Sequence, residues 1–156
     1  MFAYLIIAAV IPSFISAQLQ IIPCPGLAAV APAAIRVAGC ASMPCHVGHT
    51  ITPNHGHNFD YEADFDAHFN SQTLSLRVFE TYFGETHELT LSEQQRNACN
   101  GLVGGSCPVQ AHQRLTHGGN IEGEGNMHGG VPVEMRIEIS DDDHVCMCAL
   151  INLIVH

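Results

Sequence analysis

Residues 59–66 read FDYEADFD, and this stretch indicates the fold class because an apolar residue alternates with an acidic one throughout. Successive side chains of a β-strand point to opposite faces, so the alternation predicts a strand with one buried and one solvated face. This pattern favours a solvated surface over paired catalytic acids for the four carboxylates, Asp60, Glu62, Asp64 and Asp66. Comparable alternation recurs at 74–78, 89–91 and 133–139.

The alternating stretches are separated by turn residues, among them Gly104-Gly105 and the three aspartates at 141–143. Several short strands punctuated in this way are typical of antiparallel β-sandwiches and barrels. Residues 145–155 are apolar on both faces apart from one Asn, so we expect this strand to be central in its sheet. The chain contains no Trp, which argues against a true immunoglobulin domain with its buried core Trp.

The first residues of the chain predict secretion. Residues 1–17 contain no charged side chain and combine an apolar run with small residues at positions 16 and 17. This is the layout of a secretory signal peptide, and the run is shorter than the roughly 20 apolar residues of a membrane-spanning helix. We therefore expect cleavage after Ala17 and a soluble, secreted product with a single domain, residues 18–156.

The chain is strongly acidic, because 15 Asp and Glu residues oppose five Arg and the formal net charge is -10. Such a surface argues against nucleic acid or anionic membranes as partners. Eleven histidines would change the charge to +1 if all were protonated, which makes a pH-dependent role in binding one interpretation. Metal binding, by His46 with His49 or by His55 and His57 with Asp60, is weakly specific, and we predict no metal and no cofactor.

Seven cysteines in a secreted chain predict three disulfides and one spare thiol. The pairs 40/45 and 99/107 could each close a small loop. Cys24 could then join either Cys146 or Cys148, which are two residues apart and would point to the same face of one strand. No C-x2-C knuckle indicates zinc, and a catalytic thiol does not suit a chain whose cysteines are mostly oxidised.

An ordered set of short motifs resembles the ML (lipid-recognition) domain family, which includes the Niemann-Pick C type-2 sterol carrier and the dust-mite group-2 allergens. The motifs extend across essentially the whole of 18–156. They are IRVAGC at 35–40, MPC at 43–45, SCPV at 106–109, the strand at 133–139, DD at 141–142, and Cys146 followed by INLIV at 151–155.

The resemblance implies an all-β fold: an immunoglobulin-like β-sandwich of two antiparallel sheets with an apolar cavity between them and three disulfides. The bridges it implies are Cys24–Cys146, Cys40–Cys45 and Cys99–Cys107. Cys148 would then be the spare thiol, through which an otherwise monomeric protein could form a dimer.

The implied ligand is a sterol or a fatty acid held in the cavity. Leu91 matches an aromatic pocket position of the family, and Ile121 and Met127 lie near two other pocket positions. The remaining candidate ligand-binding residues face inward by alternation: Phe59, Tyr61, Phe65, Leu76, Val78, Val133, Met135 and Ile137.

The function implied is that of a non-enzymatic lipid carrier, secreted or in the endosomal–lysosomal lumen, with a membrane sterol transporter as a possible partner. Two alternatives stay open. A receptor for microbial glycolipids needs cations at the rim of its pocket, and a chain without Lys supplies few. A structural or signalling sandwich without a ligand would instead have a fully packed core.

Overall fold

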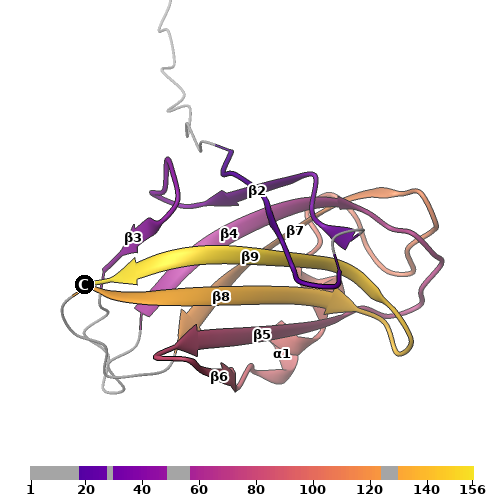
Figure 1. The fold of residues 1–156 in the computed structure, drawn as a ribbon. Helices are drawn as coiled ribbons and strands as arrows, with labels where there is room; N and C mark the ends of the chain where they lie inside the picture. Colours follow the sequence, from indigo (N-terminus) through magenta and orange to yellow (C-terminus); the bar gives the residue numbers. More distant parts are fainter. Residues whose placement is uncertain (1–17, 28–29, 49–56, 124–129) are drawn as a thin grey trace, which may run out of the picture.

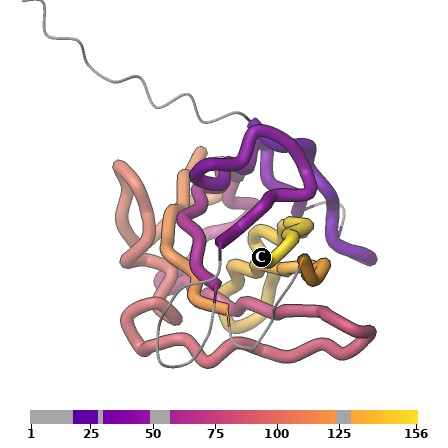
Figure 2. Tube along the Cα trace, turned by 90° about the vertical axis from the view of Figure 1, so that its left-hand side faces the viewer, coloured from indigo at the N-terminus to yellow at the C-terminus, as the bar shows by residue number. Residues whose placement is uncertain are grey.

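The computed structural model describes residues 18–27, 30–48, 57–123 and 130–156 and contains two β-sheets whose apolar faces share one core (Figure 1). The larger sheet has the order β1-β9-β8-β5-β6, and β3 also pairs with β9. Its strands are β1 (Ile22–Pro23), β3 (Cys45–Val47), β5 (Ser75–Tyr82), β6 (Glu85–Glu88), β8 (Val131–Ser140) and β9 (Val145–Val155). The smaller sheet has the order β2-β4-β7, with β2 (Ala34–Val37), β4 (His57–Asp66) and β7 (Arg114–Gly123). The all-β, two-sheet prediction is confirmed, and Figure 2 shows the same layers turned by 90°.

The predicted signal peptide, residues 1–17, and the candidate pocket residue Met127 lie outside the described residues. Within the part of the chain that the structure describes, no helix is long and apolar enough to cross a membrane.

Alternation builds β4 in the way the sequence predicts. Phe59 and Phe65 are at most 5% exposed, whereas Asp60 between them faces solvent. β4 pairs antiparallel with β2 on one side and with β7 on the other. On the outer face, the Arg36 guanidinium donates to both carboxylate oxygens of Asp64, at 2.9 and 2.8 Å, and this pairing lowers the pKa of that carboxyl group. The strand therefore gives one face to the core and one to a charged surface.

The strand β9 is central, as its apolar composition predicts. β8 pairs with β9 along the whole length of β9. β1 and β3 pair with the other edge of β9, at 149–150 and 153–155 respectively. β1 runs antiparallel to β9 and β3 runs parallel to it. The β3–β9 pair is thus a local departure from the antiparallel arrangement of the other described strand pairs.

A β-bulge in β9 decides which of its two cysteines is bridged. The register between β8 and β9 shifts by one residue next to Ser140, which leaves Cys146 as the extra residue. Cys146 consequently belongs to the core between the sheets, whereas Cys148 lies in a small separate cluster with Cys24.

The structure bridges Cys24 to Cys148, with Cα atoms 5.9 Å apart. The implied Cys24–Cys146 bridge is therefore wrong, because the bulge separates two cysteines that strict alternation would place on one face. The remaining thiol, Cys146, is 1% exposed, and burial raises its pKa to about 11. Because the Cys148 thiol is bridged, it is not available to link two copies. The other two implied bridges, Cys40–Cys45 and Cys99–Cys107, are present.

The segment after β6 ties the two sheets together at one edge. Ser92 is the N-cap of helix α1 (Glu93–Arg96), and its side chain forms a capping box with Gln95. The 3-10 helix η2 (Ala98–Gly101) follows, and the Ala98 amide donates to the Leu74 carbonyl at 2.9 Å. Two residues beyond η2, the Val103 amide donates to the Thr116 carbonyl of β7 at 2.8 Å. Residues 97–103 therefore bridge the start of β5 and the middle of β7.

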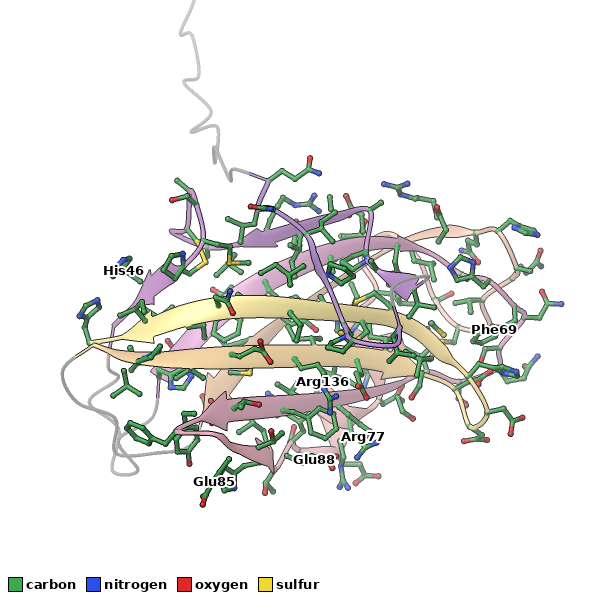
Figure 3. All side chains as sticks on the ribbon, in the orientation of Figure 1. His46, Phe69, Arg77, Glu85, Glu88 and Arg136 are labelled. Atoms are coloured by element: carbon green, nitrogen blue, oxygen red, sulfur yellow. A yellow bond between two sulfur atoms is a disulfide. The ribbon has the colours of Figure 1, made fainter. Side chains whose placement is uncertain are left out.

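On the outer face of the larger sheet, two arginine side chains contact neighbouring side chains of the same sheet. Arg77 and Arg136 lie 4.8 and 4.1 Å from the ring centroid of Phe79, a cation–π arrangement. Arg77 also pairs with Glu88 at 2.7 Å, and Figure 3 shows this group on β5, β6 and β8. These guanidinium groups are committed to neighbouring side chains on the surface of the sheet.

Candidate functional site

The space between the two sheets gathers the predicted pocket residues. Those on the smaller sheet come from β4 and β7, and those on the larger sheet come from β5 and β8. One further residue, Leu91, reaches the core from the segment before α1. All belong to a single buried cluster: Phe59, Tyr61, Phe65, Leu76, Val78, Leu91, Ile121, Val133, Met135 and Ile137.

The register sets these side chains in successive rows across the larger sheet. Val78 pairs with Ile137, and two residues further along the strand Glu80 pairs with Met135. Since neighbouring rows are two residues apart, alternate residues of β5, β8 and β9 all point at the smaller sheet. The resulting interior is apolar in most rows, and an apolar molecule is what such a surface can enclose.

An opening of about 180 Å³ lies at the edge where β5 and β7 face one another. Its lining combines inward-facing Leu76 and His117 with Gly119 and a polar rim that includes Gln95 and Asn100. A Cβ atom at Gly119 would lie 3.4 Å from Cε1 of Tyr61. The absence of a side chain at this position therefore keeps the opening clear beside the Tyr61 ring.

A second, more apolar groove of about 410 Å³ lies at the end of the larger sheet. Tyr82, Val133 and Leu153 contribute to it, together with Phe83, which is 83% exposed at the turn between β5 and β6. Val133 pairs with Leu153 across β8 and β9, so the groove touches a row of side chains that belongs to the interior. The groove therefore adjoins the interior at this end of the sandwich.

Two pairs of buried polar side chains interrupt the apolar interior. In the first, the Tyr61 hydroxyl lies 2.9 Å from Nδ1 of His117, within a hydrogen bond. Both residues are 2% exposed, and burial raises the pKa of Tyr61 while it lowers that of His117 to about 4. A neutral imidazole accepts the proton of a neutral phenol, so the first pair is complete without a buried charge.

In the second pair, His57 of β4 faces Glu80 of β5 across the two sheets. Nε2 of His57 lies 3.0 Å from Oε1 of Glu80, and each residue is 1% exposed. The contact is short but not well directed, because these two atoms and the second ring nitrogen of His57 make no hydrogen bond within the described structure.

A glycine makes room for this second pair. Gly123 pairs with His57 in the β4–β7 register. A Cβ atom there would lie 2.1 Å from Oε1 of Glu80 and 2.3 Å from Nε2 of His57. No side chain fits at this position while the pair is in place.

Of these interior polar residues, His57, Glu80 and His117 were not among the ligand-binding candidates drawn from the sequence, although His57 was considered for metal binding. The signal was nevertheless present, because His57 is in phase with Phe59 along β4 and Glu80 is in phase with Val78 along β5. His117 is likewise in phase with Ile121 along β7. Extending the alternating stretches 59–66 and 74–78 by two residues would have placed His57 and Glu80 inside the sandwich. His117 lies in a strand that the alternation did not identify.

The histidine sets considered for metal binding do not come together. His57 is buried between the sheets, while His46 lies on the surface (Figure 3). Nδ1 of His46 is 2.7 Å from Nε2 of His156. His49 and His55 lie outside the described residues. Among the residues that the structure places, no group of three His, Cys, Asp or Glu side chains is arranged to hold a metal ion.

Comparison with known proteins bears on the fold and the family. The structure is similar to the crystal structure of a Niemann-Pick type C2 protein from Japanese carpenter ant, with a TM-score of 0.61 and 11% sequence identity. The match covers 78% of this chain and 89% of that one. No curated protein sequence matches the chain. A family model of the ML domain matches residues 18–155, and with that coverage the chain belongs to the ML domain family.

Proposed function

We propose that this protein is a non-enzymatic lipid carrier that encloses a sterol or a fatty acyl chain between its two sheets. The observation that carries the proposal is the pairing of two apolar inner faces with two hollows that adjoin the space between them. One hollow is the opening beside Leu76 and Gly119, and the other is the groove beside Val133 and Leu153. The family supports the same reading, because the lipid-recognition fold binds its ligands between the sheets.

Burial of the ligand supplies the binding free energy. Each CH2 group removed from water contributes about 0.8 kcal/mol, so an acyl chain or a sterol ring system binds without a charged contact. The proposed lining residues are those of the single core cluster, with Val78, Ile121 and Ile137 completely buried at the centre. The sheets would have to separate slightly to admit the ligand, and the edge beside β7 is held mainly by residues 97–103.

Three disulfides support function in an oxidising compartment, either outside the cell or in the endosomal–lysosomal lumen. We extend the proposal to the first residues: 1–17 direct secretion and are removed. N-terminal sequencing of the protein collected from the medium of expressing cells tests this point. A mature chain that begins at Gln18 is expected, and retention of residues 1–17 would contradict it.

The lipid proposal is tested by mass spectrometry of organic extracts from protein secreted in its native form. A sterol or fatty acyl lipid in about equimolar amount is expected. The delipidated protein should then take up a fluorescent sterol or a fluorescent fatty acid. A protein that yields no lipid and takes up neither probe would contradict the proposal.

A matched pair of variants on β7 locates the ligand. Ile121 is completely buried and its neighbour Glu122 faces solvent, so the same new side chain can be placed on either face of one strand. Ile121→Phe adds volume between the sheets and should lower probe uptake, whereas Glu122→Phe should leave it unchanged. Equal uptake by the two variants would contradict a ligand between the sheets.

A further inference from the structure

The His57–Glu80 pair has hydrogen-bond donors and acceptors that no other group of the described structure satisfies. Both side chains are 1% exposed, and the two facing atoms are 3.0 Å apart without a well-directed hydrogen bond. Nδ1 of His57 also lacks a hydrogen-bond partner within the described structure. Buried polar atoms are normally satisfied, because leaving one unsatisfied is unfavourable.

The pair is also costly as a purely structural element. Burial of two titratable side chains between the sheets costs free energy that their mutual contact only partly offsets. Well-packed apolar side chains in place of such a pair are often neutral or stabilising. The strand β7 nevertheless carries Gly123 where any side chain would collide with both groups. The arrangement therefore costs stability at two places.

The location of the pair connects it to the proposed lipid site. Glu80 lies in the same row as Met135 and Ile151 of the larger sheet. The next row toward the end of the sheet contains Val133 and Leu153, which line the groove of about 410 Å³. The pair thus lies one row of side chains inside the groove, with the apolar rows beyond it.

We propose that His57 and Glu80 are a polar anchor that binds the hydroxyl group of a neutral lipid, such as a long-chain alcohol or a sterol, in preference to the carboxylate of a fatty acid. This inference rests on the proposed lipid-carrier function and names the ligand class for the same space. A hydroxyl group can donate to Oε1 of Glu80 and accept from a ring N–H of His57, which gives a partner to two of the three unsatisfied atoms of the pair. It also brings no charge into the interior.

A carboxylate fits the same place poorly. It offers only acceptors, so it cannot satisfy Oε1 of Glu80, and it would add a second negative charge beside that group. Like charges brought together at a binding surface lower the affinity. We expect the anchor to change the relative affinity for alcohol and acid by about tenfold or more.

The experiment compares hexadecan-1-ol with hexadecanoate at pH 7, each displacing the neutral fluorescent probe N-phenyl-1-naphthylamine from the delipidated full-length mature protein. The measured quantity is the ratio of the two affinities. Glu80→Gln keeps the shape of the side chain but removes its negative charge, so the ratio should shift by about tenfold toward the acid. Glu122→Gln makes the same charge change on the outer face of β7 and should keep the wild-type ratio. Cholesterol, as a third competitor, should lose affinity in Glu80→Gln together with the alcohol.

The double variant His57→Phe, Glu80→Leu provides a second test, because it removes the whole pair and leaves no buried polar group behind. It should bind the probe and show the same shift of the ratio toward the acid. A ratio that is unchanged in both variants while the probe still binds would overturn the anchor and leave the lipid carrier standing. Failure of the wild-type protein to bind the probe, the alcohol and the acid would instead overturn the carrier itself.

Discussion

The two histidine pairs between the sheets differ in how completely their polar atoms are used. Tyr61 and His117 form a hydrogen bond of 2.9 Å near the middle of β4 and β7. His57 of the smaller sheet and Glu80 of the larger sheet approach within 3.0 Å, yet their facing atoms make no hydrogen bond. Burial is nearly identical, at 1–2% exposure for all four residues. The difference therefore lies in hydrogen-bond geometry and not in access to solvent.

This contrast separates a structural pair from one reserved for a ligand. The first pair needs no charge, since burial lowers the pKa of His117 to about 4 and the neutral ring accepts the Tyr61 proton. In the second pair, Oε1 of Glu80 and both ring nitrogens of His57 have no hydrogen-bond partner among the described residues. A third group that both donates and accepts would give a partner to Oε1 and to one of the ring nitrogens. The following predictions test the distinction between the two pairs.

Breaking the second pair should have the largest effect on stability. His57→Leu leaves Glu80 buried without its partner, and loss of one member of a buried ion pair costs about 3–5 kcal/mol. The double variant His57→Phe, Glu80→Leu should recover most of that loss, because no polar group stays behind. Denaturant unfolding at pH 7 gives both free energies. A double variant as unstable as the single one would show that the pair itself stabilises the fold.

A methyl group placed beside each pair should lower the free energy of unfolding more at the second pair than at the first. Gly123→Ala places a Cβ atom within 2.3 Å of the second pair, and such overpacking should lower the free energy of unfolding by about 3 kcal/mol. Gly119→Ala is the matched control on the same strand, where the nearest atom would be Cε1 of Tyr61 at an ordinary 3.4 Å. This control should change stability by less than about 0.5 kcal/mol. Equal losses in thermal or denaturant unfolding would mean that Gly123 is not placed to accommodate the pair.

The sequence predicted the apolar part of the interior well and the polar part poorly. Alternation placed Phe59, Val78 and Ile137 inside because apolar and polar residues keep strict phase there. It missed Glu80 because a carboxylate is assigned to solvent whenever no partner is evident, and the partner His57 lies on another sheet. A pairing across two sheets depends on how the sheets stack, which is not encoded in the period of either strand.

The cysteines show a second limit. The number of bridges followed from composition, but the choice between Cys146 and Cys148 depended on a bulge of one residue. Strict alternation makes the two cysteines equivalent, and nothing in the apolar run 145–155 marks where the register shifts. The irregularity became visible only when the pairing of β8 with β9 was known.

His117 of the first pair should make the free energy of unfolding depend on pH, by about 2 kcal/mol. The pKa of His117 is about 4 in the folded protein and 6.5 as the ordinary value, so between these values the unfolded chain binds more protons. Stability from this residue is fully present above pH 6.5 and is lost as the pH falls toward 4, with about 2 kcal/mol lost between pH 7 and pH 5. Urea unfolding at the two pH values should show a smaller difference for His117→Gln than for the wild type. An undiminished difference in the variant would assign the effect to other groups.

Tyr61→Phe should have the smallest effect, because it removes one hydrogen bond and leaves the apolar ring in place. The expected loss is about 1 kcal/mol in the free energy of unfolding at pH 7. Burial is the cause of the low pKa of His117, so the difference between pH 7 and pH 5 should persist in this variant. The urea series that tests His117→Gln measures both quantities. A pH difference that disappears in Tyr61→Phe would show that the hydroxyl group, and not burial, keeps His117 neutral, and the two pairs would then be more alike than their geometry indicates.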